Sequence, residues 1–302
     1  MTRVLVTGGS GLVGRFIVED LFSHGYDVTV AGRTAPAPDL FSAPVQFVPL
    51  TLNPKADFGT AVAGCDCLIH AAFAHVPGRY RSGEGDDAPG FWRANFLSTL
   101  LLFQAAAQAG MERGVFLSSR AVYGVQSPGA VLTEKTDCHP DTHYGAVKHA
   151  CERHLGALSA KGGLAVASLR ATGVYGSLQP GEAHKWSDLF NDYLNGNPVE
   201  PRCGTEVHGR DVAAATRLML ELPEAEIAGE AFNVSDLFLD RRDLLALVRE
   251  HTGCSHSLPA EADKSSYNIA STAKLAALGW QPGGVALLQS EIERLLERVL
   301  LK

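Results

Sequence analysis

A glycine-rich turn near the amino terminus constrains the fold more than any other feature of this chain. The apolar run from Arg3 to Thr7 leads into the string from Gly8 to Gly14, and apolar residues then recur at helical spacing. This order predicts a buried strand, a tight loop and a helix. Free backbone N–H groups at the start of such a helix bind anions, so we expect a pyrophosphate there. A plain strand-to-helix turn is the alternative.

The rest of the chain repeats the alternation of strand and helix. Further strands are expected at residues 27–31, 45–50, 67–70, 115–117, 164–169 and 231–234, and helices at 57–63, 97–108, 144–158 and 211–220. Such alternation predicts an α/β fold, a doubly wound parallel Rossmann sheet of about seven strands with helices on both faces.

Two stretches depart from this alternation. Residues 173–209 are rich in Gly, Pro and polar residues around one helix at 185–194, and the tail after residue 240 is mostly helical. We therefore expect a dinucleotide-binding Rossmann domain from residues 1–172 and 208–236. A smaller, mostly helical substrate-binding domain would comprise residues 173–207 and 237–302.

Composition excludes several classes of partner. The chain of 302 residues is 46% hydrophobic with a formal net charge of -7, which supports a large core and disfavours nucleic acid. It shows neither a signal peptide nor a membrane-spanning segment, so we expect a cytoplasmic protein. Six scattered cysteines fit reduced thiols, and neither they nor the eleven histidines have the spacing of a metal site.

The end of the second expected strand bears on the choice of cofactor. An acidic residue there would hold the ribose hydroxyls of NAD, but the sequence reads Ala31-Gly32-Arg33-Thr34. A guanidinium without a carboxylate suits a 2'-phosphate, so the sequence favours NADP over NAD. The alternative is that Arg33 stacks on adenine or faces solvent.

Three side chains are candidates for proton transfer. Tyr144 and Lys148 stand four residues apart, which places them on one face of a helix. A phenol titrates near pH 10, and a cation beside it favours the phenolate, so the pair could act as a proton shuttle. Ser119 ends a buried strand, where a parallel sheet presents its ligand crevice.

Several arginines are candidates for substrate binding. The segment from residue 75 to 90 carries Arg79 and Arg81 and is expected to follow a strand, where it could act as a lid. Together with Arg120 and Arg202, these residues could grip a carboxylate or phosphate on an acidic substrate. A solvated surface loop is the alternative. Trp186 could line the pocket, although large aromatic residues are more often in the core.

Ordered motifs run through nearly the whole chain. They are TGGSGLVG at residues 7–14, HAA at 70–72, Asn95, SSRAVYG at 118–124, YGAVK at 144–148, LRATGVYG at 169–176, HGRDVA at 208–213, FNVS at 232–235 and LGW at 278–280. Together they resemble the extended short-chain dehydrogenase/reductases, the NAD(P)-dependent sugar epimerase/dehydratase group.

The resemblance implies specific roles. Tyr144 would be the general acid/base, Lys148 would hold the nicotinamide ribose, Ser119 would bond the reacting oxygen and Asn95 would support them. The cofactor would lie against the glycine loop and the HAA motif, through Gly8, Gly11, Leu12, Val13, Gly14, Ala71 and Ala72. Relatives also dimerise through the helices near residues 97–107 and 144–158, so a homodimer is expected, with core packing of those faces as the alternative.

Departures from the family pattern narrow the expected activity. Arg120-Ala121 replaces the acidic pair of the dehydratases, so dehydration is not expected. The segment from residue 199 to 208 is shorter than the loop that binds nucleoside diphosphates, which disfavours a nucleotide-linked substrate. Leu50-Thr51-Leu52 replaces an adenine-contacting aspartate.

The resemblance therefore predicts hydride transfer at a secondary carbinol or ketone of a sugar or sugar-like compound, by an oxidoreductase or an epimerase. Two alternatives remain: a reductase of non-sugar aldehydes or ketones, and a non-catalytic protein that senses NAD(P).

Overall fold

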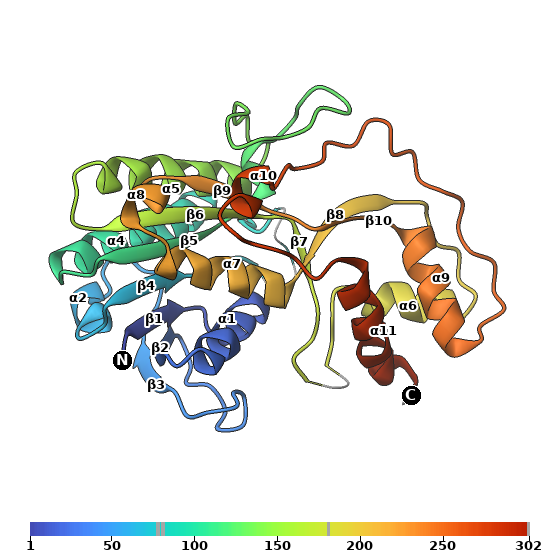
Figure 1. Ribbon diagram of the computed structural model, residues 1–302, viewed down its shortest axis with the longest axis horizontal. Coiled ribbons are helices and arrows are strands. Elements are labelled where there is room, and N and C mark those ends of the chain that lie inside the picture. The colour runs from blue at the N-terminus through green and yellow to red at the C-terminus, as the bar shows by residue number, and fades with distance from the viewer. Residues whose placement is uncertain (77–78, 80–81, 180–181, 301–302) are drawn as a thin grey trace.

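A seven-stranded parallel sheet forms the centre of the larger part of the molecule (Figure 1). In the computed structural model, which describes residues 1–76, 79, 82–179 and 182–300 and the side chains up to residue 297, the strand order is β3-β2-β1-β4-β5-β6-β9. These strands are β1 (Arg3–Thr7), β2 (Asp27–Gly32), β3 (Gln46–Pro49), β4 (Cys67–His70), β5 (Arg113–Ser119), β6 (Ala165–Ala171) and β9 (Ala231–Val234). The predicted doubly wound parallel sheet is confirmed.

Helices cover both faces of this sheet (Figure 1). One face packs against α1 (Leu12–Ser23), α7 (Gly209–Glu221), α8 (Glu224–Ile227) and α10 (Ala273–Ala276). The other packs against α2 (Phe58–Val62), α3 (Ala88–Trp92), a π-helical turn (Arg93–Leu97), α4 (Ser98–Gln108) and α5 (His143–Ser159). Along β1, Val4 and Val6 join the first core and Leu5 the second, because successive strand residues point to opposite faces.

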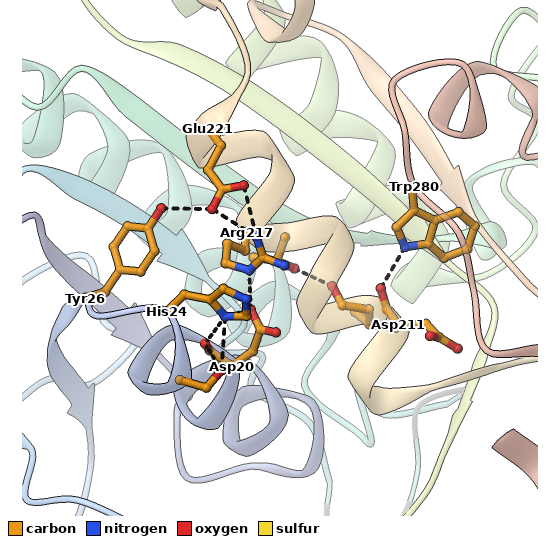
Figure 2. Close-up of polar contacts among 10 residues, drawn as sticks. Asp20, His24, Tyr26, Asp211, Arg217, Glu221 and Trp280 are labelled. Atoms are coloured by element: carbon orange, nitrogen blue, oxygen red, sulfur yellow. Dashed lines mark hydrogen bonds and ion pairs between the residues drawn. The ribbon is translucent and has the colours of Figure 1, made fainter.

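A polar cluster ties α1 to α7 on the first face (Figure 2). Arg217 of α7 donates to Asp20 of α1 at 2.8 Å and to Glu221 at 2.9 Å. Trp280 adds a bond from its indole nitrogen to the carbonyl of Asp211 at 2.9 Å (Figure 2). These contacts fix the helix that follows the glycine loop.

The smaller part of the molecule has its own sheet and core. A three-stranded sheet of order β10-β8-β7 joins β7 (Gly173–Tyr175), β8 (Cys203–His208) and β10 (Leu237–Asp240). Around it lie α6 (Ser187–Leu194), α9 (Arg241–Thr252) and α11 (Gly284–Leu300), at the right of Figure 1. This sheet was not predicted, because β7 and β10 are only three and four residues long and show too short a pattern to recognise.

None of the described helices is both long and apolar enough to cross a bilayer. Within the same residues, no group of three or more His, Cys, Asp or Glu side chains is placed to bind a metal ion.

Candidate active site

The glycine loop lies against the end of β4. Gly8 has a φ of +73°, and a Cβ on it would lie 2.6 Å from the backbone nitrogen of Ala72. Only glycine fits both constraints, so the loop touches the Ala71-Ala72 segment directly. Helix α1 begins at Leu12, and Gly11 before it provides no capping side chain. The first-turn N–H groups are therefore suited to the pyrophosphate of a dinucleotide.

A cavity lies at the ends of β2 and β3. It measures about 260 Å³ and is lined by Arg33, Leu50, Thr51 and Asp57, among others. The backbone nitrogen of Gly8 donates to Ala31 at 3.1 Å, which connects the glycine loop to β2. The position of the cavity suits the adenosine end of a dinucleotide, and Arg33 is an exposed side chain in its wall.

Helix α5 carries Tyr144 to the end of β5. Thr142 caps this helix by accepting a bond from the Gly145 nitrogen at 3.1 Å. A Cβ on Gly145 would collide with the carbonyl oxygen of Ala121, so the first turn of α5 packs directly on the turn after Ser119. The Ser119 hydroxyl accepts from the Ala121 nitrogen at 3.1 Å within that turn. The fold thus brings the serine and the tyrosine segments together.

The ammonium of Lys148 lies in an aromatic pocket below Tyr144. Its Nζ donates to the Leu117 carbonyl at 2.5 Å and lies 4.6 Å from the ring centres of both Phe73 and Phe116. The Tyr144 ring packs edge-on to Phe73 at 5.0 Å, and its centre lies 5.9 Å from the same Nζ. Burial lowers the pKa of Lys148 to about 8.

Asn95 holds the segment that carries Phe73. Its side-chain oxygen accepts from the Ala74 nitrogen at 2.7 Å, and its amide donates to the Ala74 carbonyl at 2.7 Å and to Phe91 at 3.0 Å. Asn95 is buried within the π-helical turn. It therefore fixes the backbone after β4, and π-helical turns often occur at functional sites.

A buried ionic network lies behind Ser119. The Arg170 guanidinium bonds both carboxylate oxygens of Glu152, the closest at 2.8 Å, and the Tyr123 hydroxyl at 2.9 Å. Glu152 also accepts from Ser118 at 2.5 Å. The sequence prediction missed this network, although a charged residue inside the buried strand LRA and Glu152 one turn after Lys148 were visible signals.

The predicted substrate residues have different settings. Arg79 and Arg202 are exposed. Arg120, next to Ser119, donates to the Asn268 carbonyl at 2.7 Å and lies 5.1 Å from the centre of the Tyr267 ring. Trp186 is buried in the core of the smaller part and stacks on Tyr175, which corresponds to the core alternative. Arg81 lies outside the described residues.

Comparison with known proteins identifies the family. Residues 4–235 match the family model "NAD dependent epimerase/dehydratase family". The chain belongs to this family. It is accordingly an enzyme of the extended short-chain dehydrogenase/reductase type that works by hydride transfer with a nicotinamide dinucleotide.

Individual members of the family are similar over most of the chain. UDP-glucose 4-epimerase of Corynebacterium glutamicum is 28% identical over 318 residues, which cover 93% of this chain and 91% of the relative. The 3 beta-hydroxysteroid dehydrogenase/Delta 5-->4-isomerase of Mycobacterium tuberculosis is 29% identical over 258 residues, covering 78% of this chain and 65% of that protein. The structure of Thermus thermophilus UDP-glucose 4-epimerase with NAD is 28% identical, with a TM-score of 0.77 and 98% coverage of both chains.

Proposed function

We propose that this enzyme oxidises or reduces a secondary carbinol of a sugar or sugar-like compound, with Tyr144 as the general acid/base. The observation that carries the proposal is the packing of the α5 amino terminus on the turn after Ser119, with the ammonium of Lys148 held one helical turn below Tyr144. Two of the similar proteins named above are sugar-nucleotide epimerases, which supports a carbohydrate substrate.

Each residue of the candidate site then has a separate role in proton transfer. The bound nicotinamide ring supplies the hydride acceptor or donor, and the protein moves the matching proton. Tyr144 takes the proton from the carbinol oxygen, Ser119 donates a hydrogen bond to that oxygen, and the nearby charge of Lys148 stabilises the phenolate. Asn95 keeps the segment after β4 in place.

We propose NADP as the preferred cofactor, with Arg33 binding its 2'-phosphate. The exposed guanidinium in the wall of the cavity after β2, and the absence of a carboxylate from the Ala31-Gly32-Arg33-Thr34 segment, support this choice. NAD is the alternative, which the family description and the NAD complex of the Thermus enzyme favour. Measured dissociation constants for NAD and NADP distinguish the two alternatives. NAD binding at least about tenfold tighter than NADP binding would end the NADP proposal.

One observation favours a second candidate function, reduction of non-sugar ketones. Phe73 and Phe91 pack edge to face at 5.4 Å, and Phe73 also contacts Tyr144, so aromatic surface lies beside the acid/base. A steroid dehydrogenase is among the similar proteins. A protein that senses the cofactor without chemistry is the third possibility, and the presence of Ser119, Tyr144 and Lys148 opposes it.

We also propose a cytoplasmic homodimer whose subunit has two domains, one on each sheet; α10 and Trp280, predicted in the smaller domain, pack on the main sheet and belong to the larger one. The partly exposed face of the π-helical turn and α4, including Phe96, Leu97 and Leu100, lies beside α5 and would pair with its copy. The six free cysteines suit a reducing compartment.

A substrate panel tests the proposed function. Free sugars, sugar acids, nucleotide sugars and aromatic ketones are incubated with NAD or NADP, or with the reduced forms for the ketones, and the nicotinamide absorbance is followed. We expect turnover with a carbohydrate. Release of reduced cofactor indicates net oxidation, whereas a changed sugar with cofactor retained indicates epimerisation. Turnover of the ketones alone would establish the second candidate, and no turnover at all with tight cofactor binding would establish the third.

A further inference from the structure

The chain passes from the main sheet into the small sheet beside the candidate active site. Ala171 is the register partner of Ser119 between β5 and β6. Gly173 follows two residues later, about 7 Å along an extended chain, and is paired with Glu206 of β8. Gly173 therefore lies where a substrate bound at Ser119 would extend towards the smaller part.

An ion pair occupies the space above Gly173. Lys185 and Glu206 are bonded to each other through Nζ and Oε2. A Cβ on Gly173 would lie 2.5 Å from the Glu206 Oε2 and 2.6 Å from the Lys185 Nζ. The pair thus fills the volume that a side chain at position 173 would need. Its charged atoms lie directly against the Gly173 backbone.

The two charges are differently exposed. The Glu206 side chain is 14% exposed and that of Lys185 is 30% exposed. Burial raises the pKa of Glu206, and the charges of Lys185 and Arg202 oppose that rise. The Lys185 ammonium is bonded directly to the Glu206 carboxylate, so its positive charge is already paired within the protein.

Tyr267 lies near Glu206 and also contacts the residue that follows Ser119. A Cβ on Gly204 would lie 3.8 Å from Glu206 and 3.9 Å from the Tyr267 hydroxyl. Arg120 lies over the ring of Tyr267. The Glu206 carboxylate and the Tyr267 hydroxyl therefore lie near the same glycine, and Tyr267 also contacts Arg120, the residue after Ser119.

We propose that Lys185 and Glu206 form the substrate-recognition site of this enzyme and select an uncharged polyol or sugar over a nucleoside-diphosphate sugar. A hydroxyl group can donate to the carboxylate and accept from the ammonium at once, so a neutral carbohydrate satisfies both. A diphosphate meets a fixed carboxylate and an ammonium already neutralised, which disfavours it. The inference rests on the proposed function, because it assumes that the substrate reacts at Ser119 and Tyr144.

Calorimetry of UDP-glucose binding to the cofactor-loaded protein tests whether the pair disfavours a nucleoside-diphosphate sugar. We expect weak binding to the wild type and at least about tenfold tighter binding to Glu206→Gln, because the substitution frees the charge of Lys185. Glu250→Gln, an equal charge change at an exposed position of α9, is the control and should leave binding unchanged.

Steady-state kinetics with neutral sugars from the substrate panel tests whether Lys185 and Glu206 recognise an uncharged carbohydrate. Glu206→Gln and Lys185→Gln should each raise KM at least about tenfold with less change in kcat, while cofactor binding stays at the wild-type value. Because Lys185 is exposed, Lys185→Gln should fold normally and keeps the test valid if Glu206→Gln fails to fold. Micromolar binding of UDP-glucose to the wild type, or equal binding to Glu206→Gln, would overturn the inference. If Glu206→Gln gains the binding but no carbohydrate is turned over, the exclusion stands and the proposed function fails.

Discussion

At the scale of single residues, the setting of Lys148 is the most unusual feature of the site. An ammonium is held between two phenylalanine rings and bonded to the Leu117 carbonyl. The Tyr144–Lys148 spacing was visible in the sequence. The contact of Lys148 with the two phenylalanine rings was not, because Phe73 comes from the segment after β4 and Phe116 from β5. Their contact with Lys148 depends on the parallel pairing of these two strands.

This burial predicts a pH dependence of stability. The pKa of Lys148 falls from 10.5 to about 8 on folding, so between these values the unfolded chain holds a proton that the folded protein has lost. Stability of the cofactor-free protein should therefore rise with pH over this range, by roughly 1 kcal/mol per unit, relative to Lys148→Met.

Urea unfolding of both proteins from pH 7 to 10.5 measures the difference, and other titrating groups cancel in it because the variants share them. Parallel stability curves for the wild type and Lys148→Met would contradict the burial of a charged lysine at this position.

At the scale of elements, the contact of α5 with the turn after Ser119 positions the acid/base. Gly145 is the residue of contact, and a methyl group there would meet the Ala121 carbonyl and lie 3.1 Å from Pro140. The sequence motif marked this glycine without showing what it touches. The Glu152–Arg170 pair stayed unpredicted for a related reason, since its two members lie on a helix and a strand that meet only in the folded chain.

We expect Gly145→Ala to displace the first turn of α5. The variant should lose about 1–3 kcal/mol of stability through overpacking. It should also lose about 10²-fold in kcat, because a shift of about 1 Å misplaces Tyr144. Thermal unfolding and steady-state kinetics measure the two effects.

Gly156→Ala is the matched control on the same helix. Its Cβ would lie 3.6 Å from the Gly229 carbonyl, which is ordinary contact, so stability should stay the same or rise by up to about 1 kcal/mol. Equal effects of the two substitutions would show that the contact at Ala121 has no special role.

At the scale of the whole molecule, the main sheet followed from the sequence because each of its strands is an apolar run next to a periodic helix. The small sheet did not, since β7 and β10 are only three and four residues long and the apolar pattern of β8 is interrupted by Gly204 and Glu206. Regular patterns therefore predicted the core of the main sheet, while the smaller sheet became visible only in the structure.

The proposed dimer is a property at this scale. Leu97 is 39% exposed at the start of the α4 face, and Leu97→Glu should convert a dimer into a monomer because it would bury a charge. Val131→Glu, at a 62% exposed position outside both helices, should leave the dimer intact. Sedimentation measures both masses, and a monomeric wild type would remove the proposal.

The most direct test of the account is the rate of hydride transfer in Tyr144→Phe, measured by rapid mixing with the carbohydrate that the panel identifies. We expect a loss of about 10²- to 10⁴-fold in that rate, since the ring remains and only the proton-transfer group is gone. Cofactor binding should stay within about threefold of the wild type. A near-wild-type rate with cofactor bound would contradict the assignment of Tyr144.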